Sequence, residues 1–323
     1  MLGMEGSVAH RNESAEHSGD RSLHFDPFTL RVDLDFGVFI PDANILLDLY
    51  RLPPHHRAEL SDALWTVVDR LWVPHQAMSE VLNVRPGVME TFRREIGNRS
   101  RAVAADYDKL EFLVRRDMRE WRIDKPDADH VILSLRAAKL HYQQIADSRG
   151  NEVPAQAEQK MIADVTKEID RLTTERVGAP PEEQERARWI KDSQRRVVDR
   201  RPPTAADRGK REPIRHNDCL IWHQMLKFAR EHGRGRPIVL ITRDLKEDGW
   251  VEYRDRRPSG AHPLLVEEMH AAAGSRFVVI TAQHLLSYVH EQRTTLWRGD
   301  RGWGPDADQG TLRPIRSLLP WNE

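Results

Sequence analysis

Several features are absent from this 323-residue sequence, and each absence excludes a class of protein. A single cysteine, Cys219, excludes an internal disulfide framework and a zinc site built from cysteines. No stretch of about 18 uncharged apolar residues is present, and the first 30 residues lack the apolar segment of a signal peptide. A glycine-rich phosphate loop is also missing, which argues against an NTPase. We therefore expect a soluble, cytoplasmic protein that has no membrane partner.

The composition predicts a folded core with polar extensions. Hydrophobic residues make up 39% of the chain, charged residues 31%, and the formal net charge is −1. Residues 1–30 are rich in small and charged side chains without periodicity, so we expect them to be disordered. Residues 291–323 are polar with scattered Trp and Pro, and we expect a C-terminal tail there.

Short apolar runs alternate with helical patterns at both ends of the remaining sequence. Residues 38–40 and 71–73 are typical of buried strands, and each precedes an amphipathic helical pattern. A further helix is predicted over 217–233, followed by the most apolar strand, 238–241. A last strand at 277–280 and a last helix at 282–289 complete the pattern. This alternation predicts an α/β fold with a parallel sheet.

Residues 86–212 differ in character, because long charged helical patterns dominate and strand-like runs are missing. We interpret this stretch as a helical insertion that interrupts a discontinuous α/β domain of residues 31–85 and 213–290. Residues 186–215 contain eleven Lys and Arg against four Asp and Glu. Such a segment is either a solvated helix face or an arm that binds nucleic acid.

Four acidic residues occupy equivalent places in the predicted fold. Asp42 and Asp244 directly follow strands, Glu80 lies in the helix after the second strand, and Asp218 begins the helix before the most apolar strand. The carboxyl ends of parallel strands meet at one edge of a sheet, where functional groups collect. Helices packed at that edge would bring Glu80 and Asp218 within reach. We predict that these four carboxylates meet in one site.

Four carboxylates at one point repel each other and would raise one another's pKa values. A divalent cation relieves this repulsion, and carboxylate oxygens favour hard cations such as Mg²⁺ or Mn²⁺. A cation site of this kind activates water and stabilises charge on a phosphate. The four acids are therefore our candidate catalytic and metal-binding residues.

Four segments together show a resemblance to a known family. In order along the chain they are VFIPDANILLDLYR, LWVPHQAMSEVLNVR, HNDCLIWHQMLKFA and IVLITRDLKEDGW. They resemble a PIN-domain nuclease. The resemblance is to the bacterial PIN-like subgroup with a long helical insertion, and it covers under a third of the chain. It implies a three-layer sandwich with a central parallel sheet. It also implies hydrolysis of phosphodiester bonds, usually in RNA, that depends on Mg²⁺ or Mn²⁺ and leaves a 5′-phosphate and a 3′-hydroxyl.

The same resemblance assigns supporting residues around the acids. Asn44 is the polar neighbour of the first acid and Thr242 the hydroxyl before the fourth, while Lys246, Glu247 and Asp248 match a charged continuation. Arg243 departs from the pattern, since an acid or small polar residue is expected there. It would either contact phosphate or weaken metal binding.

Other interpretations remain open from the sequence alone. Asp42, Asn44 and Asp218 are also suited to capping helices, Asp244 to a turn and Glu80 to a helix surface. Cys219 has no base partner in the sequence and is predicted to be a core residue. The favoured function is an endoribonuclease, and a toxin or phage-defence effector held inactive by a protein inhibitor is a further interpretation. The alternative is a non-catalytic module that binds a partner protein through the insertion.

Overall fold

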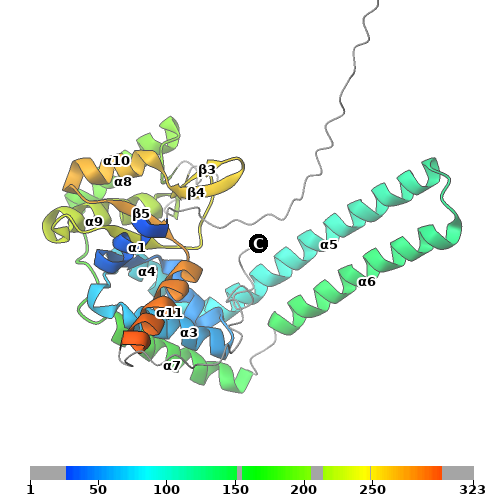
Figure 1. Cartoon of the computed structure of the whole chain (residues 1–323), viewed down its shortest axis with the longest axis horizontal. Coiled ribbons are helices and arrows are strands. Elements are labelled where there is room, and N and C mark those ends of the chain that lie inside the picture. Colours follow the sequence, from blue (N-terminus) through cyan, green and yellow to red (C-terminus); the bar gives the residue numbers. More distant parts are fainter. Residues whose placement is uncertain (1–26, 151–154, 205–213, 248, 300–323) are drawn as a thin grey trace, which may run out of the picture.

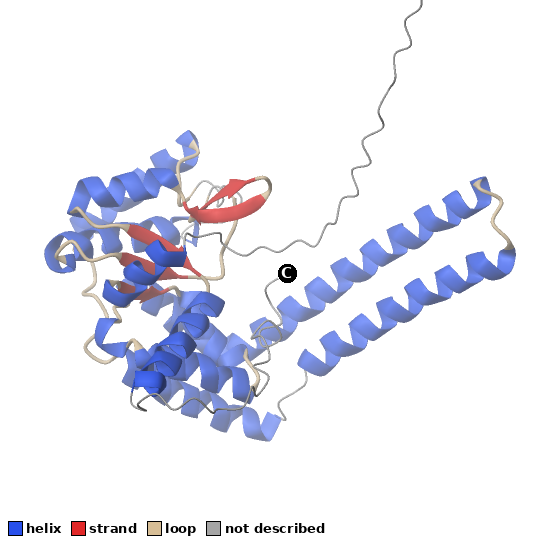
Figure 2. Ribbon diagram, in the orientation of Figure 1, coloured by secondary structure: helices blue, strands red, loops and turns tan. Residues whose placement is uncertain are grey.

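The computed structural model describes residues 27–150, 155–204, 214–247 and 249–299. It is a mixed α/β body from which one helical hairpin projects (Figures 1 and 2). Within these ranges, none of the helices combines the length and the apolar character needed to cross a bilayer. Of the predicted disordered segment, residues 1–26 lie outside the described residues, as do residues 300–323 of the predicted tail.

Three parallel strands form the central sheet in the order β1-β2-β5. They are β1 (Val38–Pro41), β2 (Ile238–Ile241) and β5 (Phe277–Ile280). Every residue of these strands is buried, which indicates that helices and loops cover both faces. The register pairs Pro41 with Ile241 and Ile241 with Ile280, so the three carboxyl ends are level. The predicted α/β fold with a parallel sheet is confirmed.

The predicted strand at residues 71–73 forms two single bridges instead of a full strand. Leu71 pairs in parallel with Phe39 of β1, and Val73 pairs in parallel with Val177. The backbone amide of Trp72 donates to the Phe39 carbonyl at 2.9 Å. The segment therefore extends the sheet beside β1, but Pro74 begins the next helix too soon for a longer ladder.

Helices before and after this segment surround the sheet. Helix α4 contacts both α2 and α9, while α11 contacts α3 and β5, and α10 contacts α9 and β5. The bounds are α2 (Ala43–Arg51), α3 (Pro54–Thr66), α4 (His75–Val84), α9 (Asn217–Phe228), α10 (Pro263–Ala273) and α11 (Ala282–Gly299). Short helical turns lie at Val68–Arg70, Arg85–Gly87, Ile214–His216 and Ala229–Gly233.

The insertion is helical, as its charged patterns predict, but only half of it projects. Helices α5 (Val88–Glu120) and α6 (Lys125–Gly150) form the antiparallel hairpin that extends away from the body in Figure 1. At about 1.5 Å per residue, α5 is about 50 Å long. Ion pairs join the two helices, with Lys139 Nζ 2.6 Å from Asp108 and Arg136 Nη2 2.8 Å from Glu111.

The other half of the insertion belongs to the body. Helix α7 (Ala155–Thr173) contributes Val165, Ile169 and Leu172 to the main hydrophobic core. Helix α8 (Glu183–Asp199) packs against α9. The boundaries of the insertion stay a prediction, but the part that projects from the body as an arm consists of α5 and α6.

Ordered structure extends beyond the predicted ends of the α/β domain. Helix α1 (Pro27–Phe36) begins inside the segment predicted to be disordered, and Leu34 joins the core. Helix α11 continues well past its predicted end. Both Tyr288 and Gln292 of α11 donate hydrogen bonds to Asp35 Oδ1, at 3.1 and 2.7 Å. These contacts join α1 to α11, which is consistent with a helix at α1, where none was predicted, and with an α11 that is longer than predicted.

A β-hairpin after the sheet strand β2 was not predicted from the sequence. It consists of β3 (Val251–Arg254) and β4 (Arg257–Ala261). Asp255 and Arg256 form its turn with φ of 50° and 63°. Such a turn favours Asn-Gly or Asp-Gly, and the Asp-Arg found here gives only a weak sequence signal. The hairpin matters for the site because Tyr253 Oη donates to the Leu245 carbonyl at 2.7 Å.

Candidate active site

The first candidate acid, Asp42, lies directly after β1 and is the N-cap of α2. Its Oδ1 accepts the Ala43 amide at 2.7 Å, and its Oδ2 accepts Asn44 Nδ2 at 3.2 Å. Capping and a site role are therefore combined in one residue. Burial raises the pKa of this carboxyl, while the hydrogen bonds from Thr242 and Asn44 oppose that rise. The nearby charge of Asp244 adds to the increase.

Thr242 connects the first and the fourth candidate acids. It follows β2, and its backbone amide continues the sheet ladder to the Ile280 carbonyl at 3.0 Å. The hydroxyl donates to Asp42 Oδ2 at 3.0 Å and accepts the Asp244 amide at 3.0 Å. The side chain is completely buried. One hydroxyl therefore positions an acid from β1 and an acid from β2, 202 residues apart in the sequence.

Asp244 lies at the mouth of this arrangement and is partly exposed. Its Oδ2 accepts Lys246 Nζ at 2.7 Å, so an ammonium group already faces this carboxylate. The charged continuation after the fourth acid thus contacts the acid itself. Asp248, which the resemblance assigns to the same continuation, lies outside the described residues.

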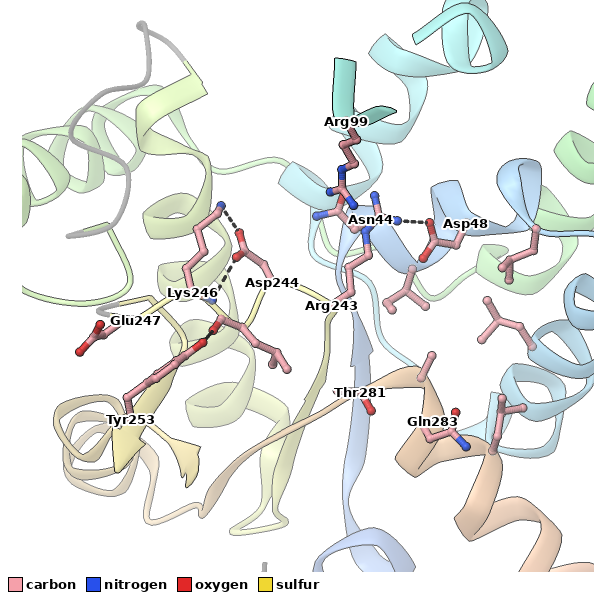
Figure 3. Close-up of a pocket in the computed structure, with 16 residues that line it drawn as sticks. Asn44, Asp48, Arg99, Arg243, Asp244, Lys246, Glu247, Tyr253, Thr281 and Gln283 are labelled. Carbon is pink, nitrogen blue, oxygen red and sulfur yellow. Dashed lines mark hydrogen bonds and ion pairs between the residues drawn. The ribbon is translucent and has the colours of Figure 1, made fainter. Parts of the chain in front are cut away.

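A pocket of about 550 Å³ opens at this edge of the sheet. Asn44 and Asp48 of α2, Arg99 of α5, and Arg243, Asp244 and Lys246 after β2 contribute its polar lining. Figure 3 shows Arg99, Arg243 and Asn44 close together on one side, with Asp244 and Lys246 on the other. The pocket is thus lined by acidic and basic groups from three separate parts of the chain.

Asp48 is a site residue that the sequence interpretation missed. Burial raises the pKa of its carboxyl to about 6, and the charge of Asp42 adds to the increase, while Arg243 and Arg51 oppose it. Arg243 Nη1 lies 2.9 Å from Asp48 Oδ1. This pair accounts for the unexpected arginine before Asp244, because Arg243 neutralises a buried acid one turn beyond Asn44. The spacing Asn44–Asp48 is the signal that places both side chains on one helix face.

A family model described as a PIN like domain matches residues 38–264, which include β1, the hairpin arm and the segment after β2. The chain belongs to the PIN-like domain family. No curated protein and no solved structure matches it. PIN-like domains belong to a superfamily of nucleases, which bind nucleic acid and typically use divalent metal ions.

The other two candidate acids of this PIN-like domain lie on neighbouring helices. Glu80 is in the middle of α4, and Asp218 is in the first turn of α9. The N-terminal turn of α4 contacts α9 directly, since the Gln76 amide donates to Gln224 Oε1 at 3.0 Å and Gln76 Nε2 donates to Asn217 Oδ1 at 3.2 Å. Asp218 is not the N-cap, a position that His216 occupies. Their joint action with Asp42 and Asp244 stays a prediction.

A different group has the compact spacing of a metal site. In the described part of the PIN-like domain, ligand atoms of Asp192, Cys219 and His223 lie within 4.8 Å of one another. However, Asp192 Oδ2 accepts Arg196 Nε at 2.6 Å and His223 Nε2 lies 3.0 Å from the same oxygen. Burial raises the pKa of the Cys219 thiol to about 12, so the thiolate is disfavoured. We interpret this group as a structural network around the buried Arg196 guanidinium.

This network also bears on the basic segment 186–215. Arg196 pairs with Asp192 and with Glu268 of α10, and it donates to the Pro202 carbonyl at 2.7 Å. Part of the positive charge of this segment, that of Arg196, is therefore compensated by acids inside the body and is not presented to a binding partner. Residues 205–213 of the segment lie outside the described residues.

Proposed function

We propose that this PIN-like protein is a metal-dependent nuclease that hydrolyses phosphodiester bonds, with RNA as its substrate. The observation that supports the proposal most directly is the Asp42–Thr242–Asp244 arrangement at the carboxyl end of the sheet. Two carboxylates that follow different strands are close enough for the charge of Asp244 to raise the pKa of Asp42, at the rim of a pocket that also holds arginines.

The residues of the site fit a hard divalent cation. Its donors are carboxylate, amide and hydroxyl oxygens, the ligand set preferred by Mg²⁺ and Mn²⁺. A buried carboxylate whose pKa is raised by desolvation and by a second acid is stabilised when a cation approaches. Asp42 and Asp244 would hold the ion, with Glu80 and Asp218 as the further ligands. A cation bound there would lower the pKa of water and neutralise charge on the phosphate.

The remaining side chains have positioning roles. Asn44 and Thr242 fix the Asp42 carboxylate through hydrogen bonds at 3.2 and 3.0 Å. Lys246 occupies one oxygen of Asp244 and would release it to an ion. Fixing a ligand before the ion binds reduces the reorganisation that binding requires.

The test is cleavage of a labelled single-stranded RNA by the purified chain. We expect cleavage with Mg²⁺ or Mn²⁺, none with EDTA, and loss to background in Asp42→Asn. Asp106→Asn is the matched control, because Asp106 is an exposed α5 acid that pairs with Lys109 on its own helix. Cleavage that survives both Asp42→Asn and Asp244→Asn would contradict this assignment.

The cleavage assay and an expression test with one further variant separate the competing functions. A non-catalytic module would bind partners through the insertion and would cleave no nucleic acid under any metal condition. A toxin or defence effector would inhibit growth when expressed, and Asp218→Asn would remove that inhibition. Harmless expression of the wild type would argue against the effector role.

A further inference from the structure

Three arginines from separate elements converge beside the candidate acids. Arg51 ends α2, Arg99 belongs to the base of α5, and Arg243 follows β2. All three line a small pocket of about 30 Å³. This pocket shares Asp48, Leu52, Arg99 and Arg243 with the larger site pocket, so the two are adjoining compartments. Arg99 reaches the shared wall from above in Figure 3.

Arg51 is buried without adequate partners. Only 6% of it is exposed, yet its Nε and Nη1 have no hydrogen-bond acceptor among the described residues. The carboxylate oxygen Asp48 Oδ1 lies 3.7 Å from Nη1, beyond hydrogen-bond distance. Burial lowers the pKa of Arg51, and the charge of Arg243 lowers it further. A buried guanidinium with unused donors is costly unless an anion completes its surroundings.

The acids around the small pocket do not balance the arginines. Asp48 and Glu95 are the acidic residues of its lining, against Arg51, Arg99 and Arg243. Asp48 Oδ1 already accepts Arg243 Nη1 at 2.9 Å. This contact does not satisfy Arg51, whose Nε and Nη1 keep unused N–H donors. The compartment therefore has a surplus of both positive charge and hydrogen-bond donors.

We propose that Arg51, Arg99 and Arg243 form a subsite for a phosphate of the nucleic-acid backbone, one that adjoins the phosphate to be cleaved. Guanidinium groups match phosphate oxygens in two-point hydrogen bonds. The small compartment has room for about one water-sized group, which suits a single phosphate oxygen directed at Arg51. The rest of the phosphate lies in the larger compartment, whose lining continues to Asn44 and Asp244.

This subsite assigns a second purpose to the helical arm. Arg99 lies in the first half of α5, so the arm helix contributes a side chain to the substrate path in addition to projecting from the body. The subsite holds the strand but does not react, so all three arginines are positioning residues. The identity of the substrate rests on the proposed function, whereas binding of a phosphate anion does not.

The first experiment measures anion binding without catalysis. Pyrophosphate is titrated into the full-length chain in EDTA by isothermal calorimetry. We expect saturable binding by the wild type and affinity about tenfold weaker in Arg99→Gln, from loss of one charge-assisted hydrogen bond. Arg101→Gln is the matched control, because Arg101 is exposed on the same helix and donates to Asn98 outside both pockets. It should bind like the wild type.

The second experiment measures the same variants on labelled single-stranded RNA with Mn²⁺. We expect Arg99→Gln to raise KM about tenfold with kcat little changed. The slope of log affinity against log salt should become shallower by about one. Arg51→Met should show the same split, and its thermal melt reports whether it folds. If Arg51→Met does not fold, the result for Arg99→Gln tests the subsite.

The two experiments separate this subsite from the nuclease proposal. Pyrophosphate binding that weakens in Arg99→Gln supports the subsite even if the wild type cleaves no RNA. RNA cleavage with the same KM in Arg99→Gln and Arg101→Gln overturns the subsite while the nuclease stands. The absence of saturable pyrophosphate binding by the wild type also overturns it.

Discussion

Thr242 is the side chain on which the candidate site depends most directly at the scale of single residues. Its hydroxyl uses both of its hydrogen-bonding modes, donating to Asp42 and accepting from the Asp244 amide. The parallel pairing of β1 with β2 brings the two acids to one edge of the sheet, and this buried group bridges them there. A hydroxyl is required here, whereas the methyl group of Thr242 contributes only packing.

We therefore predict that Thr242→Val is damaging and that Thr242→Ser is tolerated. Valine removes one of the two hydrogen bonds to Asp42 Oδ2 and leaves the Asp244 amide without this acceptor, which should lower the free energy of unfolding by about 1–3 kcal/mol. Loss of this positioning contact should weaken Mn²⁺ binding about 10–100-fold. Calorimetric Mn²⁺ titration and denaturant unfolding measure both effects. Equal Mn²⁺ affinity in the valine and serine variants would show that the bridge is unimportant.

The pKa of about 6 at Asp48 makes a second prediction possible. A carboxyl whose pKa is higher in the folded state than in the unfolded state stabilises the fold when protonated. That stability is present below about pH 4 and is lost as the pH rises through about 6. In EDTA, the wild type should lose on the order of 2–3 kcal/mol relative to Asp48→Asn between about pH 4 and about pH 7.

Denaturant unfolding at several pH values measures this difference. Asp42 is present in both proteins, so the difference between them reports the titration of Asp48 together with its coupling to Asp42. A constant difference between the two proteins across this pH range would show that Asp48 is not held in the buried state described here.

The proximity of Asp42 and Asp244 was accessible from the sequence because strand ends in a parallel sheet converge, whereas Thr242 was assigned through the family resemblance. Apolar runs mark the strands, and the polar residues directly after them are then neighbours in space. Asp48 was not accessible in this way. It lies inside an amphipathic helix, where an acid usually faces solvent, and its partner Arg243 comes from a segment nearly 200 residues later.

At the scale of helices, the insertion contains projecting helices and helices packed against the body, and its composition does not distinguish the two. Helices α7 and α8 are as charged as the arm, yet each faces the body. In α7, the spacing of Val165, Ile169 and Leu172 gives one apolar side, which joins the main core. In α8, an arginine is buried, because Asp192 and Glu268 compensate its charge. Pairing between distant elements cannot be derived from composition.

This difference predicts opposite outcomes for two truncations of large side chains in the insertion. Ile169→Ala on α7 should lower the free energy of unfolding by about 2–5 kcal/mol, because the side chain is 1% exposed and leaves a cavity. Leu133→Ala on α6 should change it by less than about 0.5 kcal/mol, because that side chain is 63% exposed. Urea unfolding followed by tryptophan fluorescence measures both. A similar loss in the two variants would mean that the arm is packed against the body.

At the scale of the molecule, the projecting hairpin and the candidate site are connected through the base of α5. The α/β body, its parallel sheet and the helical character of the insertion followed from the sequence pattern, since strand-like runs are confined to the two flanking regions. The direction of the hairpin did not, because it depends on how α5 leaves the body after α4. That exit places Arg99 in the site pocket and most of the hairpin far from it.

The outer hairpin should therefore be removable without loss of the chemistry. Asp108 and Lys139 lie opposite each other, 2.6 Å apart at their charged groups, so a short Gly-Ser linker can replace residues 109–138. The deletion removes one side chain of the described core, Ile132, and retains Arg99 and all four candidate acids. We expect helical content to fall, the midpoint of body unfolding to stay within a few degrees, and Mn²⁺-dependent cleavage of a short RNA to persist. Circular dichroism and the cleavage assay measure these outcomes. If cleavage disappears while the body remains folded, the outer hairpin contributes to the active site in a way that its distance from the pocket does not explain.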